Sequence, residues 1–464
     1  MKYISTRGGI SGIDFKETIF EGLASDGGLI LPEKIPVLSE EEINQLKNLS
    51  YKELASKIFQ YYISDISEEE LKEIIEKAYS LFRAKEIVPI KKVGEIYILE
   101  LFHGPTWAFK DIALQFLGVL FEKLLLESGK KINILGATSG DTGSAGIYGV
   151  KGRKNIAIFV LHPYKRVSEI QALMMTTVTD KNVHNLAIEG TFDDCQAIVK
   201  AIFMDLDFKK AYNLTAINSI NWARILAQIV YYFWAYFRVT EIEGKEQVRI
   251  SVPTGNFGDI FAGYIAKKML GGERIEKLIL ATNENDILCR FVNNGDYSVR
   301  RVKPTITPSM DIQIASNFER YLYYLYDEDS EKTKKAMESF AKNKALKFSQ
   351  EEIKKVQKDF LSASVTQEET LKTIKEFFEK TGYILDPHTA VGVKAGIKFK
   401  NNYPLICLAT AHPAKFPDTI EKALNKKIDL PDEIKRLYKL PSRYKVLSAD
   451  ITNCLLYTSP SPRD

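Results

Sequence analysis

The chain is poor in cysteine and has little excess of charge of either sign. Four cysteines occur in 464 residues, and no two of them form a C-x-x-C pair. This usage excludes a disulfide framework and predicts reduced thiols in a cytoplasmic protein. The net charge is only +4 and is spread over the whole length. Because no basic face or arm stands out, we expect no nucleic-acid partner.

Long apolar runs and targeting signals are also missing. The start, MKYISTRGG, lacks the apolar stretch of a signal peptide. The most apolar long stretch, ILAQIVYYFWAYF (225–237), is shorter than the roughly 20 residues that cross a bilayer. We therefore expect no membrane partner and predict a buried core helix here.

Metal-binding and common nucleotide-binding patterns are absent as well. The five histidines do not combine with cysteines or carboxylates at zinc-ligand spacing, so we expect no metal. His388 precedes an expected helix start, where it could act as the cap. The glycine-rich loops match neither G-x-G-x-x-G nor the P-loop pattern.

The sequence does contain a repeated strand–loop–helix pattern. Hydrophobic residues make up 45% of the chain, and nearly continuous apolar runs predict buried parallel strands, followed in most cases by helical patterns. This alternation predicts an α/β fold with helices on both faces of parallel sheets. The predicted strands cover 132–135, 156–161, 184–188, 248–252, 277–281 and 404–409.

Three polar or glycine-rich loops follow predicted strands, where α/β proteins bind ligands. They are GATSGDTGSAG (136–146), PTGNFGD (253–259) and ATAHPAKF (409–416). Backbone amides at a helix start suit a phosphate. For the first loop, a plain helix cap explains the composition equally well. In the second, Asp259 would repel a phosphate unless it serves as the helix cap.

One lysine lies among apolar and aromatic neighbours, in HGPTWAFKD (103–111). A desolvated lysine has a lowered pKa and can attack a carbonyl carbon. A surface Lys110 paired with Asp111 at a helix start explains this segment equally well.

These segments, in this order, resemble threonine synthase, a fold-type-II enzyme that depends on pyridoxal 5′-phosphate. NSINWAR (218–224) and DPHTAVG (386–392) belong to the same set of motifs, and YISTRGG (3–9) and GLASDGGLILPEKIP (22–36) resemble the longer branch of that family. The resemblance covers about residues 1–445. It implies two parallel-sheet lobes of the tryptophan synthase beta type with a mainly helical N-terminal lead domain.

The resemblance also implies the cofactor site. Lys110 is similar to the family's Schiff-base lysine, and Thr410 to the partner of the pyridine nitrogen. The loop that holds the cofactor phosphate corresponds to Gly255, Asn256, Phe257 and Gly258.

The substrate site follows from the resemblance in the same way. Implied ligands of the substrate's carboxylate and phosphate are Thr138, Ser139, Asp141, Thr142, Asn218, Ser219 and Arg224. Related fold-type-II enzymes have Asn where this chain has Asp141, so the role of that residue is open.

We expect four regions: a lead domain (1–98), a smaller lobe with the lysine and substrate loop (99–215), a larger lobe with the phosphate loop (216–445), and a tail (446–464). The end of that tail is Ser/Pro-rich and has no helical or strand period, and we expect the whole tail, 446–464, to be disordered or non-native.

The resemblance implies conversion of O-phospho-L-homoserine and water to L-threonine and phosphate, by a monomer or homodimer. Two alternatives are a related phospho-lyase that releases 2-oxobutyrate, ammonia and phosphate, and an inert protein that binds the cofactor and acts through interactions.

Overall fold

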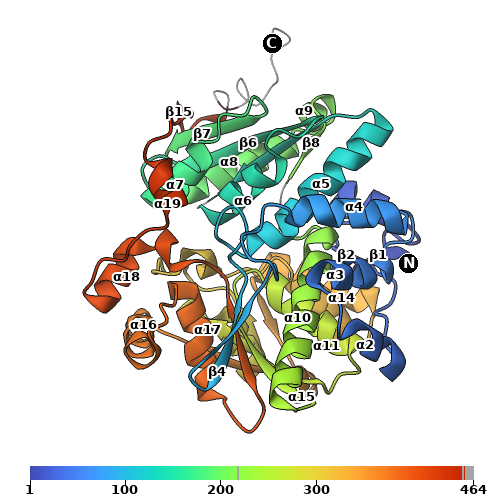
Figure 1. The fold of residues 1–464 in the computed structure, drawn as a ribbon. Coiled ribbons are helices and arrows are strands. Elements are labelled where there is room, and N and C mark those ends of the chain that lie inside the picture. Colours follow the sequence, from blue (N-terminus) through green and yellow to red (C-terminus); the bar gives the residue numbers. More distant parts are fainter. Residues whose placement is uncertain (139, 217–218, 452–453, 455–464) are drawn as a thin grey trace. The chain divides into compact units, whose positions relative to one another are not determined.

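The computed structural model describes residues 1–138, 140–216, 219–451 and 454 (Figure 1). The chain divides into two compact units, each assembled from separate segments of the sequence. Unit 1 comprises Met1–Glu76, Phe82–His103 and Ser219–Ile428, and unit 2 comprises Lys77–Leu81, Gly104–Asn218 and Asp429–Asp464. The chain therefore leaves unit 1 and returns to it, and the domain boundaries expected above stay predictions.

Unit 1 is built around a six-stranded sheet with the order β13-β10-β9-β14-β4-β3. Neighbouring strands are parallel, except that the edge strand β3 is antiparallel to β4. The bounds are β3 (Ile90–Val93), β4 (Ile96–Glu100), β9 (Val248–Pro253), β10 (Ile275–Thr282), β13 (Phe360–Ser364) and β14 (Leu405–Ala409). Two small antiparallel sheets pair β1 (Tyr3–Ser5) with β2 (Ile30–Pro32) and β11 (Asp296–Ser298) with β12 (Ala345–Lys347).

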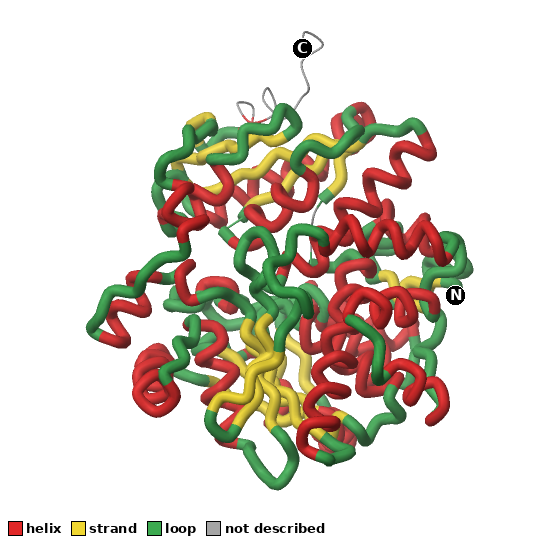
Figure 2. The backbone as a smooth tube through the Cα atoms, viewed as in Figure 1, coloured by secondary structure: helices red, strands yellow, loops and turns green. Residues whose placement is uncertain are grey.

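Helices flank this sheet, which Figure 2 shows as a twisted layer of strands. The N-terminal helices are α1 (Phe15–Glu21), α2 (Glu40–Leu46), α3 (Tyr51–Gln60) and α4 (Glu68–Tyr79), the last of which continues into unit 2. The others are α10 (Trp222–Glu243), α11 (Gly258–Met269), α12 (Ile287–Asn294), α13 (Phe318–Leu325), α14 (Ser330–Asn343), α15 (Gln350–Asp359), α16 (Gln367–Thr381), α17 (Pro387–Lys398) and α18 (Pro417–Leu424), with short 3-10 turns η1 (Pro308–Met310) and η2 (Pro413–Lys415).

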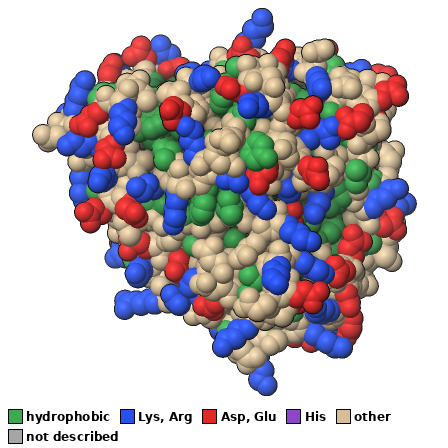
Figure 3. All heavy atoms as spheres, turned by 90° about the horizontal axis from the view of Figure 1, so that it is seen from below, with side chains coloured by type: hydrophobic (Ala, Val, Ile, Leu, Met, Phe, Trp, Pro, Cys, Tyr) green, Lys and Arg blue, Asp and Glu red, His purple; other side chains and the backbone are tan. Residues whose placement is uncertain are grey.

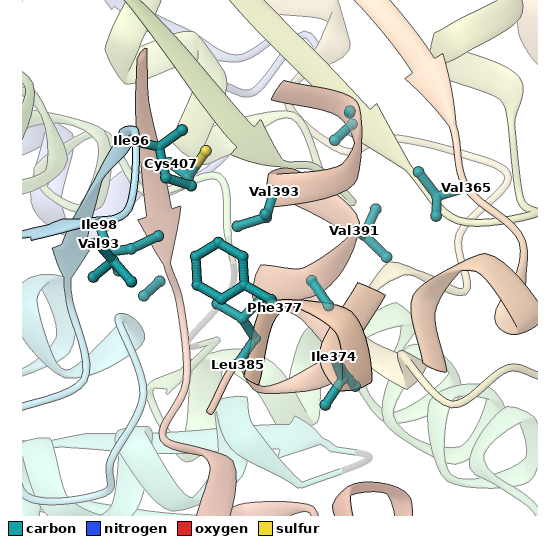
Figure 4. Close-up of a cluster of buried hydrophobic side chains, with 14 of the residues drawn as sticks. Val93, Ile96, Ile98, Val365, Ile374, Phe377, Leu385, Val391, Val393 and Cys407 are labelled. Carbon is teal, nitrogen blue, oxygen red and sulfur yellow. The ribbon is translucent and has the colours of Figure 1, made fainter. Parts of the chain in front are cut away.

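Apolar residues fill the space between this sheet and α16 and α17. Figure 4 shows Ile374 and Phe377 of α16 and Val391 and Val393 of α17 in one buried cluster. Ile279 and Ala281 of β10 belong to the same cluster. Because successive strand residues point to opposite faces, Leu278, the residue before Ile279, lies on the other face, against α11. The two-sided burial explains the continuous apolar run in β10.

Unit 2 contains a five-stranded, fully parallel sheet with the order β15-β7-β6-β5-β8. Its strands are β5 (Ile132–Ala137), β6 (Ile156–Pro163), β7 (Val183–Glu189), β8 (Leu214–Thr215) and β15 (Lys445–Ser448). Its helices are α5 (Lys110–Ser128), α6 (Asp141–Val150), α7 (Glu169–Thr176), α8 (Phe192–Met204), α9 (Leu206–Ala211) and α19 (Asp432–Leu437).

The predicted fold is confirmed. All six predicted strands are present, as β5, β6, β7, β9, β10 and β14, and the apolar stretch 225–237 lies in the buried helix α10. The ordered chain continues beyond residue 445, because β15 pairs with β7 in the sheet of unit 2. Residues 452–453 and 455–464, in the expected non-native tail, lie outside the described residues.

Charged side chains of both signs are interspersed on the face drawn in Figure 3. All four cysteines are buried, and the described residues form no disulfide bond. Among the described residues, no helix is long and apolar enough to cross a membrane, and no three side chains of His, Cys, Asp or Glu are grouped as they would be around a metal.

Candidate active site

The predicted phosphate loop and Thr410 follow neighbouring strands in unit 1. The loop follows β9 and precedes α11, while Thr410 follows β14, and the two strands are paired in parallel through Ile406 and Ile250. Because parallel neighbours end at the same edge of a sheet, the structure brings these two segments together. In unit 2, the predicted substrate loop follows β5 in the same way, and Lys110 is the first residue of α5.

The segment Gly255–Gly258 has the backbone shape of an anion-binding turn. Phe257 is the N-cap of α11 and takes a left-handed conformation with φ 64°, although its side chain is almost fully buried. A left-handed residue at this point turns successive amides toward one side, and the first amides of a helix have no partner within it. A Cβ on Gly255 would lie 2.8 Å from the carbonyl oxygen of Ser309. The loop therefore fits a phosphate and has no room for a side chain at Gly255.

Asp259 does not face the amides of this loop as a cap, and the N-cap of α11 is Phe257. The Asp259 carboxylate accepts hydrogen bonds from the hydroxyls of Tyr231 and of Tyr232, the latter at 2.8 Å, both in α10. The second carboxylate oxygen is buried and receives no hydrogen bond from the described residues. Burial raises the pKa of Asp259 to about 6, against the stabilising effect of the two hydroxyls. The carboxylate is thus held by two hydroxyls of α10.

The raised pKa gives Asp259 a measurable effect on stability. Because the pKa is higher in the folded state than its value of 3.8 in the unfolded chain, the folded state binds the proton more tightly, and stability falls as the pH rises from 4 to 6. We expect the free energy of unfolding of Asp259→Asn, relative to the parent protein, to grow by about 2.5 kcal/mol between pH 4 and pH 8. Unfolding of both apoproteins across this range measures the difference.

The matched control is Asp193→Asn. Asp193 is likewise the second residue of a helix, α8, but it is exposed to solvent. We expect no comparable growth of the difference for this variant. A constant difference for Asp259→Asn from pH 4 to pH 8 would contradict a proton-binding role for the buried carboxylate.

A hydrogen-bond chain holds the backbone of Thr410. Its amide donates to the Thr389 hydroxyl at 3.2 Å, and that hydroxyl donates to the carboxylate of Asp386. Asp386 is the N-cap of α17 and also accepts from the amides of His388 and Thr389. The expectation that His388 could cap the helix is wrong, because it is the second residue of the helix and Asp386 is the cap. Thr410 itself is almost fully buried.

The histidine nearest to Thr410 in sequence is held as a neutral cap. His412 accepts a hydrogen bond from the Ala414 amide through Nδ1 at 3.1 Å and packs edge-on against Phe102. Burial, with the neighbouring His103, lowers the pKa of His412 to about 4. His412 is therefore uncharged at neutral pH, and its hydrogen bond with Ala414 holds the loop that follows β14.

Lys110 is placed by a compact turn. The Asp111 carboxylate accepts two hydrogen bonds of 2.7 Å from Thr106, one from the amide and one from the hydroxyl, and Asp111 is fully buried. A Cβ on Gly104 would lie 2.4 Å from the Asp111 side chain, and Trp107 is left-handed with φ 59°. Lys110 itself is partly exposed at the start of α5. The turn thus fixes the backbone at Lys110, whose side chain is partly accessible to solvent.

The predicted substrate loop of unit 2 is organised by Thr138. Its hydroxyl accepts hydrogen bonds from the amides of Gly140 at 3.0 Å and Gly143 at 2.8 Å. Asp141 is buried and accepts a hydrogen bond of 2.8 Å from the Gln171 side chain. Thr142 is the second residue of α6 and is partly exposed, where its hydroxyl and amide suit an anion. Predicted ligand Ser139 lies outside the described residues.

The remaining predicted ligands lie before and in α10. The Ser219 hydroxyl is 2.6 Å from that of Ser316, and Arg224 is the third residue of the helix. Burial lowers the pKa of Arg224 to about 10, so it stays charged at neutral pH. Asn218 lies outside the described residues. Arg224 is thus a buried cation in the first turn of a helix, a setting that favours a bound anion.

Several residues that shape the site were not singled out by sequence reasoning. Asp386 and Thr389 lie in the motif DPHTAVG but were given no role. Gln171, Asn317 and Arg320 lie outside every motif, and only the folded chain shows that they contact predicted site segments.

Comparison with known protein families accounts for most of the chain. Residues 2–79 match the family model "Threonine synthase N terminus", and residues 389–454 match "Threonine synthase, C-terminal". Residues 76–352, more than half of the chain, match the model of pyridoxal-phosphate-dependent enzymes.

Individual relatives match over nearly their full length. Threonine synthase of Pseudomonas aeruginosa is 43% identical over 99% of this chain and 98% of its own. The human protein called threonine synthase-like 2 is 37% identical over 90% of this chain and 88% of its own. Among solved structures, pyridoxal-phosphate-bound threonine synthase from Brucella melitensis is 42% identical, with a TM-score of 0.95 over 99% of this chain and 98% of its own.

Proposed function

Because the chain belongs to the threonine synthase family of pyridoxal-phosphate-dependent enzymes, we propose that it converts O-phospho-L-homoserine and water into L-threonine and phosphate. The observation that carries this proposal is the identity of more than 40% along almost the whole chain. The predicted family, fold and cofactor are thereby confirmed. The substrate and the role of each residue belong to the proposal.

The residues present fit the cofactor. The amides of Gly255–Gly258 hold its phosphate, since the left-handed Phe257 and the start of α11 present them together. Thr410 is the partner of the pyridine nitrogen, and a hydroxyl there does not force protonation of the ring as a carboxylate would. Lys110 carries the covalent attachment. When bound, pyridoxal phosphate withdraws electrons from the carbon atoms next to the substrate's amine.

The chain's own groups then bind the substrate and move protons. Arg224 binds the phosphate of the substrate, and its charge favours the leaving phosphate as the bond to Cγ breaks. The Nζ of Lys110 would move the substrate's protons one at a time: it would take them from Cα and Cβ and return them to Cγ and finally to Cα. Water adds at Cβ after Cγ has been protonated. Further contacts to the substrate's carboxylate and phosphate come from Thr138, Ser139, Thr142, Asn218 and Ser219.

Gln171 gives Asp141 a defined part in this scheme. Its side-chain amide donates to Asp141, and its oxygen accepts a hydrogen bond from Ser168 at 2.8 Å. A Cβ on Gly140 would lie 2.5 Å from the Gln171 side chain, so the two segments are in close contact. Asp141 therefore acts by fixing the loop through Gln171, while Thr142 faces the substrate.

The protein works in the cytoplasm as a monomer or homodimer.

Product analysis tests the proposal. We expect purified holoenzyme given O-phospho-L-homoserine to release threonine and phosphate in equal amounts. Accumulation of 2-oxobutyrate and ammonia without threonine would instead identify a phospho-lyase, the alternative that shares all the motifs. Binding of pyridoxal phosphate without turnover would identify an inert interaction protein. Both of these results contradict the proposal.

A further inference from the structure

Asn317, the N-cap residue of α13, lies between two predicted site segments of unit 1. Its backbone amide donates to the carbonyl oxygen of Asn256, in the phosphate loop, at 3.0 Å. Its side-chain amide donates to the carbonyl oxygen of Ser219, in the predicted substrate segment, at 3.0 Å. We propose that Asn317 is a positioning residue that sets the substrate-phosphate segment at Ser219 against the cofactor-phosphate loop. This inference rests on the proposed function.

Arg320 fixes the orientation of the Asn317 side chain. The Asn317 side-chain oxygen accepts a hydrogen bond of 2.5 Å from the Arg320 guanidinium, which leaves the Asn317 Nδ2 to face Ser219. The guanidinium is fully buried and also donates to the carbonyl oxygens of Ile30, at 2.9 Å and 3.1 Å, and Ile220, at 2.5 Å. Because guanidinium groups only donate hydrogen bonds, the side-chain oxygen of Asn317, and not its nitrogen, must face Arg320.

The same guanidinium connects three parts of the chain. Ile30 belongs to β2 near the N-terminus, Ile220 directly follows Ser219, and Arg320 is in α13. Burial lowers the pKa of Arg320 to about 9, so the side chain keeps its charge at neutral pH. Hydrogen bonds from a charged donor to carbonyl oxygens are stronger than neutral ones and restrict movement of the loop at residues 219–221.

Two further contacts strengthen the link between the segments. Ser316 is 2.6 Å from the Ser219 hydroxyl, so consecutive residues of one turn both hold Ser219. A Cβ on Gly258 would lie 3.1 Å from the Asn317 Nδ2, so this glycine leaves the space that Asn317 occupies. Displacement of a binding group by about 1 Å can cost a hundredfold in rate. A rigid connection between the segments therefore matters for phosphate binding.

Asn317→Asp separates this role from general stability. The variant keeps the backbone amide bond to Asn256 and an acceptor for Arg320, but it places a carboxylate oxygen against the carbonyl oxygen of Ser219. The matched control is Asn343→Asp, since Asn343 is an exposed residue at the end of α14. The probe is inorganic phosphate, titrated calorimetrically into the holoenzyme, beside the KM for O-phospho-L-homoserine.

We expect Asn317→Asp to raise the Kd for phosphate and the KM by about tenfold, the effect of losing one hydrogen bond. The Kd for pyridoxal phosphate, measured by fluorescence of the apoprotein, should change less than about threefold, because the bond to Asn256 remains. Asn343→Asp should resemble the parent protein in all three constants. A merely structural residue would lower the unfolding temperature and leave the phosphate Kd unchanged.

Two results would overturn the inference. One is an unchanged phosphate Kd in Asn317→Asp, and the other is an equal loss of affinity for phosphate and for the cofactor. If this variant does not fold, Ser316→Ala decides by the same criterion, with an expected two- to threefold rise in the phosphate Kd. Failure of the parent protein to make threonine would count against the proposed function alone, because phosphate binding is measured without turnover.

Discussion

Lys110→Ala should abolish threonine formation, with a fall in kcat of at least about 10⁴-fold. The visible absorption band of the lysine-bound cofactor should disappear at the same time, and borohydride treatment should no longer fix the cofactor to the protein. Absorption spectra of the holoenzyme and peptide mass analysis after reduction measure these two effects.

The physical reason is that the Lys110 amine has two roles in the proposed reaction, and an alanine side chain has no group that could fill either of them. In the proposed mechanism Lys110 would hold the cofactor covalently, and its amine would then move the protons of the substrate. The turn before α5 is fixed by the hydrogen bonds from Thr106 to Asp111, neither of which uses the side chain of Lys110. Removal of this side chain therefore removes neither of these two hydrogen bonds, which join other residues.

Lys123→Ala is the matched control. Lys123 lies on the same helix, α5, where it pairs with Glu127 at 3.0 Å. This partly exposed pair contributes little to stability, so the variant should keep both the band and the activity. Retention of the borohydride-fixed adduct at the parent level in Lys110→Ala would place the covalent attachment at another residue.

The local features of the fold could be predicted because they depend on neighbouring residues. Uninterrupted apolar runs such as IAIFVL identify strands buried on both faces, and β6 is one of them. The apolar stretch ILAQIVYYFWAYF (225–237) in the same way predicts a buried helix, and it lies in α10. The order of motifs then led to the family, which the comparisons confirm.

The supporting contacts could not be predicted because they join residues far apart in the chain. The bond between Asn317 and Ser219 spans 98 positions, and no periodicity or turn signal specifies such a pair. Asp259 shows the same limit: its sequence position suggested a helix cap or a repulsive charge. Two tyrosines from α10 bind the carboxylate instead, and only the packing of α10 against α11 brings them together.

Arg224→Leu should lower kcat/KM for O-phospho-L-homoserine by about 10³-fold, or about 4 kcal/mol, because two charge-assisted hydrogen bonds to the phosphate are lost. Arg224→Lys keeps the charge but not the planar fork, so we expect an intermediate loss of about tenfold to a hundredfold. Steady-state rates per cofactor-loaded site measure both variants.

Arg238→Leu is the control on the same helix. Arg238 lies 14 positions after Arg224, about 21 Å along the axis of α10, where it bonds to the carbonyl oxygen of Lys47 and packs over the ring of Trp234. Its loss should lower the unfolding temperature and leave kcat/KM within about twofold, since these contacts hold the helix and not a ligand. The two variants therefore separate phosphate recognition from anchoring of α10. Equal kcat/KM in Arg224→Leu and the parent protein would show that the buried guanidinium does not bind the substrate's phosphate.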